Sequence, residues 1–225
     1  MSGSRMFPFI TKTWNPVVGC RHGCVYCWAR KLAEGKLKGT ERYKNGFKPQ
    51  FIEKELDKFF RGKEFVFVCD MGDLFGSWVP YSWIKAVLDR ISTMSADFLL
   101  LTKNPHRYLD FKIPENCICG ATVESDIDWH VTGAEHPLYR LAEMKALSHP
   151  RKMLAIEPIL QFNFEYFIDR ILNIKPEFVA VGYDNYDNHM PEPSLAKTMQ
   201  LIDRLEKAGI TVYRKTLRKA WNERR

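Results

Sequence analysis

Short apolar runs, rich in β-branched or aromatic residues, alternate along this 225-residue chain with charged, amphipathic segments. Residues 65–68 (FVFV) and 98–101 (FLLL) are apolar at every position. Such continuous apolarity indicates strands covered on both faces, which is typical of a parallel sheet. We predict strands at residues 10–14, 65–69, 98–102, 117–123, 153–156, 178–181 and 211–214.

Amphipathic segments between these strands predict helices. They lie at residues 29–33, 51–60, 80–91, 137–147, 164–172 and 194–208. Ser194 suits an N-cap and Gly209 a helix stop. Alternating strands and helices form right-handed crossovers on a parallel sheet. We therefore predict one α/β domain over residues 1–225, a partial (β/α)6-type barrel with a largely parallel sheet, with 1–9 and 217–225 as peripheral tails. A flat doubly wound sheet is the alternative.

The composition fits a globular protein away from membranes. The apolar fraction is 45%, which is ample for a core. The sequence has no apolar stretch near the roughly 20 residues that a membrane span needs, and residues 1–6 lack the apolar core of a signal peptide. We therefore expect a cytoplasmic protein. In a reducing compartment, clustered cysteines more often bind metal than form disulfides.

Three of the six cysteines stand in one short loop. Cys20, Cys24 and Cys27 fall between the first predicted strand and the helix at 29–33. Three thiolate ligands leave one position on a metal or cluster without a nearby protein donor, and a small molecule can bind and react there. A zinc site closed by His22 or by a remote cysteine is the alternative.

The spacing Cys-x3-Cys-x2-Cys, with Tyr26 before the last cysteine, resembles the signature of the radical SAM (S-adenosylmethionine) superfamily. Residues 13–16 (TWNP) and 26–29 (YCWA) resemble its phage Gp37/Gp68-like branch, a domain of unknown function. The resemblance implies a partial barrel in which Cys20, Cys24 and Cys27 ligate a [4Fe–4S] cluster. It also implies that S-adenosylmethionine binds the fourth iron and is cleaved to a 5′-deoxyadenosyl radical, which abstracts hydrogen from a substrate. The electron would come from a flavodoxin- or ferredoxin-like donor.

The same resemblance assigns further cofactor contacts, all beyond the carboxyl ends of predicted strands, where parallel α/β sheets place their chemistry. Tyr26 would lie against the adenine. Gly72 and Asp73 occupy the place of a Gly-Gly-Glu-like turn that binds the methionine amino group, although Met71 and the aspartate depart from that pattern. Candidates for ribose or substrate contacts are Glu124, Ser125 and Glu157.

Other residues near the strand ends have two readings. Lys103 and Lys215 could meet a carboxylate or phosphate, or could be solvated lysines at the rim. Asn15 could hydrogen-bond into the site, whereas Trp14 suits packing. The remaining cysteines, at positions 69, 117 and 119, suit buried structural roles.

The net charge of +7 favours an anionic partner. The densest basic runs are 31–48 and 214–225. A nucleic-acid or nucleotide-like substrate is therefore one hypothesis, and solvated faces are the alternative. The basic tail comprises Arg214, Lys215, Arg218, Lys219, Arg224 and Arg225. Two competing functions are a zinc-stabilised nucleic-acid-binding protein without catalysis and a relative that keeps a cluster only to sense redox state.

Overall fold

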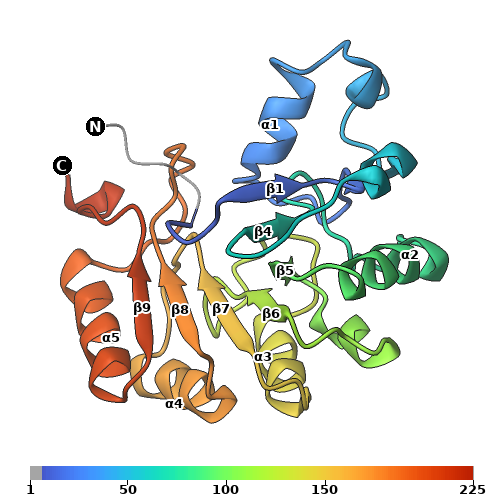
Figure 1. Ribbon diagram of the computed structural model, residues 1–225. Coiled ribbons are helices and arrows are strands. Elements are labelled where there is room, and N and C mark those ends of the chain that lie inside the picture. Colours follow the sequence, from blue (N-terminus) through green and yellow to red (C-terminus); the bar gives the residue numbers. More distant parts are fainter. Residues whose placement is uncertain (1–6, 225) are drawn as a thin grey trace.

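A computed structural model describes residues 7–224 and contains a seven-stranded parallel sheet that curves into a half-barrel (Figure 1). The strands lie side by side in chain order, and every neighbouring pair is parallel. They are β1 (Lys12–Trp14), β4 (Phe65–Val68), β5 (Asp97–Thr102), β6 (Cys117–Thr122), β7 (Lys152–Ile156), β8 (Phe178–Val181) and β9 (Thr211–Arg214). The predicted fold class is confirmed.

Four helices cover the convex face of this sheet (Figure 1): α2 (Tyr81–Ser92), α3 (Pro137–Ala146), α4 (Phe164–Ile174) and α5 (Leu195–Lys207). The shorter α1 (Trp28–Glu34) stands beyond the end of β1. A small antiparallel pair joins β2 (Val17–Val18) to β3 (Gln50–Phe51). Single 3-10 turns are η1 (Glu41–Tyr43), η2 (Glu53–Asp57), η3 (Pro105–Asp110) and η4 (Trp221–Glu223).

The strands alternate between two apolar layers, which explains their continuous apolarity. Val66 and Val68 of β4 pack into the core beneath the helices, whereas Phe67 faces the concave side. In β5, Phe98 and Leu100 lie on the helix side and Leu99 on the concave side. Because side chains alternate along a strand, burial of both faces requires an apolar residue at every position.

Both segments predicted as peripheral contribute packed residues. Phe7 is buried, and its ring lies 5.9 Å from that of Phe67 on the concave face. Near the other end, the Glu223 carboxylate accepts a hydrogen bond from the backbone of Leu195 at the start of α5, at 2.9 Å. Phe7 and Glu223 therefore both contribute to the packing of the fold.

Most element boundaries agree with the prediction to within two residues. The Ser194 hydroxyl caps α5 by accepting from Lys197 N at 3.2 Å, and Gly209, with φ of +84°, follows the helix end. The helix predicted at 51–60 is wrong, because this segment forms β3 and η2. Phe51 instead stacks on Trp83 of α2, with ring centroids 5.3 Å apart.

The three cysteines outside the loop lie in the core beneath the helices, as predicted. Cys69, Cys117 and Cys119 are all buried there, and Ile118 between the last two faces the concave side. Trp14 is also buried, and its indole N–H donates to Glu55 O at 2.8 Å, which confirms its packing role. Within the described part of the chain, every helix is too short or too polar to cross a membrane.

Candidate active site

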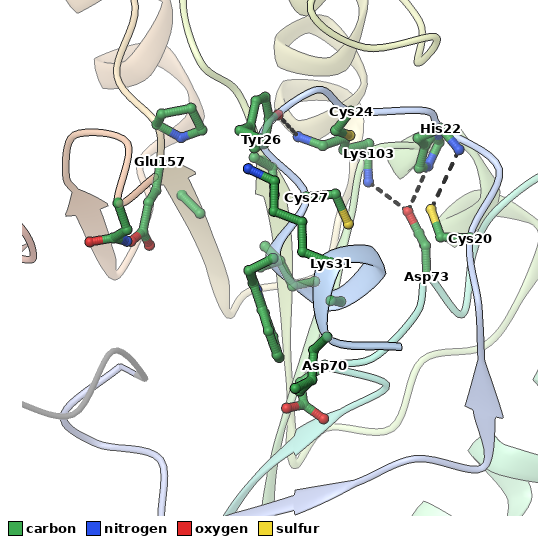
Figure 2. Close-up of a pocket in the computed structure, with 18 of the residues that line it drawn as sticks. Cys20, His22, Cys24, Tyr26, Cys27, Lys31, Asp70, Asp73, Lys103 and Glu157 are labelled. Atoms are coloured by element: carbon green, nitrogen blue, oxygen red, sulfur yellow. Dashed lines mark hydrogen bonds and ion pairs between the residues drawn. The ribbon is translucent and has the colours of Figure 1, made fainter. Parts of the chain in front are cut away.

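A cavity of about 660 Å³ opens at the carboxyl ends of the strands, between the cysteine loop and the loop that follows β8. This volume is in the range of small-molecule sites. Figure 2 shows the cysteine side chains and Glu157 on different walls of the cavity. The predicted site residues that line it are Cys20, Cys24, Tyr26, Cys27, Gly72, Asp73 and Glu157.

The cysteine loop is held from two sides. Gly19 N donates to Met71 O at 2.9 Å, beside a short bridge between Gly19 and Gly72 that extends the β1–β4 edge. On the other side, Gly133 N donates to His22 O at 2.6 Å. These backbone contacts fix the path of the loop, so the directions of its cysteine side chains are set by the protein.

Each of the three cysteine sulfurs takes part in a hydrogen bond within the protein. The Cys27 Sγ caps α1 by accepting from Arg30 N at 3.3 Å, and the Cys20 Sγ accepts from His22 N at 3.5 Å. The Cys24 thiol donates to the Thr132 hydroxyl at 3.2 Å. Backbone N–H groups directed at sulfur favour the thiolate and tune a bound iron–sulfur group.

Burial opposes the charge of the free thiols. It raises the pKa of Cys20, with a further contribution from Asp73, and it also raises the pKa of Cys27. The free thiols of Cys20 and Cys27 are therefore protonated at neutral pH. A metal group that binds them must displace those protons, so its affinity rises with pH.

The three cysteines fit a cluster better than a single ion. Each thiolate of a cluster binds a different iron, so its ligands need not converge on one point. Among residues 7–224, no three His, Cys, Asp or Glu side chains converge closely enough to hold one metal ion. The predicted fourth zinc ligand, His22, directs its Nε2 at Asp73 Oδ2 over 2.8 Å. The remote cysteines lie in the core beneath the helices.

Asp73 connects the cysteine loop to the sheet. In addition to His22, its carboxylate accepts from the Thr102 hydroxyl at 2.7 Å and from the backbone N–H groups of Lys103 and Phe75, each at 3.0 Å. Burial alone would raise the pKa of Asp73, but these hydrogen bonds, led by that from His22, hold it below its usual value. The predicted contact of Asp73 with a methionine amino group stays a prediction.

A buried charged network stands behind Tyr26. Its hydroxyl contacts Glu124 Oε1 and accepts from Lys103 Nζ at 2.7 Å, and Lys103 also pairs with Glu124 Oε1. Arg140 of α3 donates to Glu124 Oε2 at 2.9 Å. Lys103 is therefore held in an ion pair inside the protein and is not a solvated lysine at the rim. Although burial favours the protonated form, Lys103 and Arg140 hold the pKa of Glu124 far below its usual value.

Two predicted candidates do not reach the cavity wall. Glu124 lies behind Tyr26 and Lys103, and Ser125 is fully buried with its hydroxyl donating to Gln161 O at 2.5 Å. On the far wall, Glu157 Oε2 lies 3.6 Å from Lys215 Nζ, so the second predicted lysine also meets a carboxylate. Burial raises the pKa of Glu157 and lowers that of Lys215, each opposed by the other residue.

Asn15 joins two loops below the cavity and does not point into it. Its Nδ2 donates to Asp70 Oδ1 at 2.6 Å, and its Oδ1 accepts from Met71 N at 3.0 Å. At the rim, Lys31 of α1 lies 4.7 Å over the Tyr186 ring and donates to Asn188 Oδ1 at 3.1 Å. The helix after the cysteine loop thus contacts the loop after β8.

Comparison with known proteins identifies the family of this chain. A family model described as "Protein of unknown function (DUF5131)" matches residues 5–182. The chain belongs to this DUF5131 family. No curated protein matches the sequence.

Among solved structures, the DUF5131 chain is similar to a double mutant of spore photoproduct lyase with bound AdoMet and dinucleoside spore photoproduct. The TM-score is 0.54 at 10% identity, over 92% of this chain and 65% of that one. It is also similar to SuiB of Streptococcus suis bound to S-adenosylmethionine, with a TM-score of 0.53 at 14% identity, over 93% of this chain and 47% of that one. The chain thus spans less than two thirds of each. At these identities the likeness shows the radical SAM-like fold alone.

The basic tail of the DUF5131 chain has less free charge than its sequence suggests. Four of its cations face carboxylates, and Arg225 lies outside the described residues. The pairs are Arg214–Glu206 at 2.9 Å, Lys215–Glu157 at 3.6 Å, Arg218–Glu192 at 2.7 Å and Arg224–Asp187 at 2.9 Å. Four of the five described charges of the tail are therefore offset locally, and Lys219 is exposed without an ion pair within residues 7–224.

We expect Gly19→Ala to displace the cysteine loop of the DUF5131 chain. Gly19 has a φ of +81°, and a Cβ there would lie 2.3 Å from the carbonyl oxygen of Lys48, which is backbone and cannot swing away. The variant should lose more than about 3 kcal/mol of unfolding free energy and most of its capacity to bind iron. Urea unfolding and iron analysis after anaerobic reconstitution measure both effects.

Gly39→Ala is the matched control, because Gly39 has a similar φ of +90° and no atom within 4 Å of the added Cβ. It should cost about 1 kcal/mol from backbone strain alone and leave iron binding intact. Equal losses in the two variants would show that the contact with Lys48 does not position the loop.

Proposed function

We propose that this chain is a radical S-adenosylmethionine enzyme in which Cys20, Cys24 and Cys27 hold a [4Fe–4S] cluster. One observation carries the proposal: all three side chains line a single cavity at the carboxyl end of a radical SAM-like half-barrel. When bound, the cluster would supply the electron that cleaves S-adenosylmethionine to a 5′-deoxyadenosyl radical, which abstracts hydrogen from the substrate. The residues of the chain would bind and orient the cofactor and exclude water.

The chain's apolar residues would keep water from the reacting atoms. Phe67 of β4, Leu101 of β5 and Ala155 of β7 line the cavity from the concave side of the sheet. Excluding water protects a reactive species from side reactions and strengthens the electrostatic interactions inside the site. The cavity therefore offers an apolar floor beneath a polar rim.

The polar residues would orient the cofactor. Tyr26, held by Lys103 and Glu124, presents a fixed aromatic ring for the adenine. A side chain at Gly72 would come within 3.0 Å of Gly19 O, so glycine keeps the cysteine loop against the end of β4. Glu157, which lines the opposite wall, would meet ribose or substrate. Fixed geometry of this kind lowers the entropic cost of bringing the reacting atoms together.

Anaerobic purification and reconstitution test the proposal. We expect a brown protein with about four irons per chain that releases 5′-deoxyadenosine from S-adenosylmethionine under reductant. A colourless protein with one stoichiometric zinc would instead support the alternative function, a zinc-stabilised nucleic-acid-binding protein without catalysis. A brown protein that releases no 5′-deoxyadenosine would support the redox sensor. Placement in the phage Gp37/Gp68-like branch and the flavodoxin- or ferredoxin-like donor stay predictions.

A further inference from the structure

Residues 19–50 carry almost the whole net charge of the protein. Their eight basic and two acidic residues give +6, against +7 for the entire chain. We call this segment the basic lobe; it contains the cysteine loop, α1, η1 and the start of β3. Its cations are Arg21, Arg30, Lys31, Lys36, Lys38, Arg42, Lys44 and Lys48.

Six of these eight cations have no acidic partner in the described part of the chain. Arg42 and Lys44 form ion pairs with Glu55 and Glu41. In contrast, no ion pair within residues 7–224 involves the other six, and four of them, Arg21, Lys36, Lys38 and Lys48, are exposed and form the open surface of the lobe. The basic lobe thus has more unpaired positive charge than the described part of the C-terminal tail, where only Lys219 has no ion pair.

The basic lobe also borders the cavity. Lys31 and Lys36 line it, and Figure 2 shows Lys31 on α1 near Tyr26 and Cys27. Trp28 lies at the same rim and is 39% exposed, although it is one of the largest apolar side chains. Arg42 lines a second, adjoining cavity that shares Trp28 with the first. A polyanion on the lobe would therefore lie directly beside the cavity mouth.

We propose that the basic lobe docks a single-stranded nucleic acid and that the cavity acts on one unpaired nucleotide of it, an inference that rests on the proposed function. Lysine is depleted in protein–protein interfaces, whereas nucleic-acid interfaces are strongly positive. Five of the eight cations are lysines. An exposed tryptophan among cations is the arrangement on which bases stack.

The test measures the affinity of the cluster-loaded protein for labelled single-stranded DNA and RNA. The oligonucleotides are about 20 nucleotides long, which is longer than a typical single-strand binding site. Fluorescence anisotropy is measured anaerobically over a range of salt concentrations. The variant replaces Lys36, Lys38 and Lys48 by Gln. Losing three phosphate contacts should reduce the slope of log K against log salt by about 2, which weakens binding about 100-fold at roughly 0.1 M salt.

A matched control replaces Lys112, Lys145 and Lys219 by Gln, three exposed lysines outside the basic lobe. It removes the same net charge and should keep both slope and affinity. Equal weakening by the two triple variants would overturn the proposal, as would binding that is insensitive to salt.

An acidic electron-donor protein is the rival occupant of the basic lobe. The proposal is also overturned if the Lys36, Lys38 and Lys48 variant keeps its oligonucleotide affinity but is reduced more slowly by a ferredoxin-like protein. Cleavage of S-adenosylmethionine in the absence of oligonucleotide is measured on the same samples. It reports the proposed function separately, so the failure of one inference is distinguishable from the failure of the other.

Discussion

Replacing Cys24 by alanine is expected to abolish both iron binding and the release of 5′-deoxyadenosine. With Cys24 gone, two thiolates remain, and a cluster would expose two irons instead of one. Cys24 is partly exposed at the cavity, and its one side-chain hydrogen bond is to the Thr132 hydroxyl. The fold should therefore survive, with a change in unfolding free energy below about 1 kcal/mol. Iron and sulfide analysis, Mössbauer spectra and product chromatography measure the outcome.

Cys119→Ala is the matched control. Cys119 is fully buried on the helix side of β6, away from the cavity. Its loss should cost about 1 kcal/mol of stability through the missing sulfur contacts and leave about four irons per chain. A Cys24→Ala protein that retains its full iron content and activity would contradict the ligand assignment, because another side chain would then hold that corner of the cluster.

The inner strands of the sheet, β4 to β8, were predictable because they are largely apolar on both faces. Phe178–Val181 and Thr211–Arg214 agree with the prediction to the residue. The error at residues 51–60 arose because apolar residues at positions 51, 52, 56, 59 and 60 imitate one face of a helix. Long-range contacts decided otherwise: Phe51 pairs with Val17, and the indole of Trp14 binds the carbonyl of Glu55. Local periodicity contains no information about such partners.

The candidate site was likewise predictable only in part. Cys20, Cys24 and Cys27 lie within one short loop. Their presence at a single cavity could therefore be predicted from their spacing. The partners of Asp73 and Glu124 could not. Arg140 looks like an ordinary charged residue within an amphipathic helix, yet it is fully buried against Glu124. His22 and Asp73 are 51 residues apart. The type of a residue in a single sequence does not show which distant residue it contacts in the fold.

Glu124→Gln should be the most destabilising single change away from the cysteine loop. The side chains of Glu124 and Arg140 are 3% and 1% exposed, and that of Lys103 is 11% exposed. An amide keeps the shape of the carboxylate but removes its charge, which leaves two buried cations facing each other. Breaking a buried pair in this way costs about 3–5 kcal/mol. Urea unfolding at neutral pH measures the loss.

Two comparisons separate this effect from ordinary charge removal. Glu165→Gln breaks an exposed pair with Arg204, in which the glutamate side chain is 77% exposed, and should cost less than about 0.5 kcal/mol. Adding Lys103→Met to Glu124→Gln removes one of the two buried cations that have lost their carboxylate. The double variant should recover part of the lost unfolding free energy, because the two residues interact directly. A Glu124→Gln protein as stable as the wild type would show that water reaches the network.

The same network predicts how stability depends on acid. Because the pKa of Glu124 is lowered on folding, its contribution is fully present above the unfolded value of about 4.3. That contribution is lost progressively as the pH falls below that value toward the lower pKa of the folded state. The stability difference between wild type and Glu124→Gln should therefore shrink as the pH is lowered from about 5 toward 2. A difference that stays constant over this range would mean that folding does not change the pKa of Glu124.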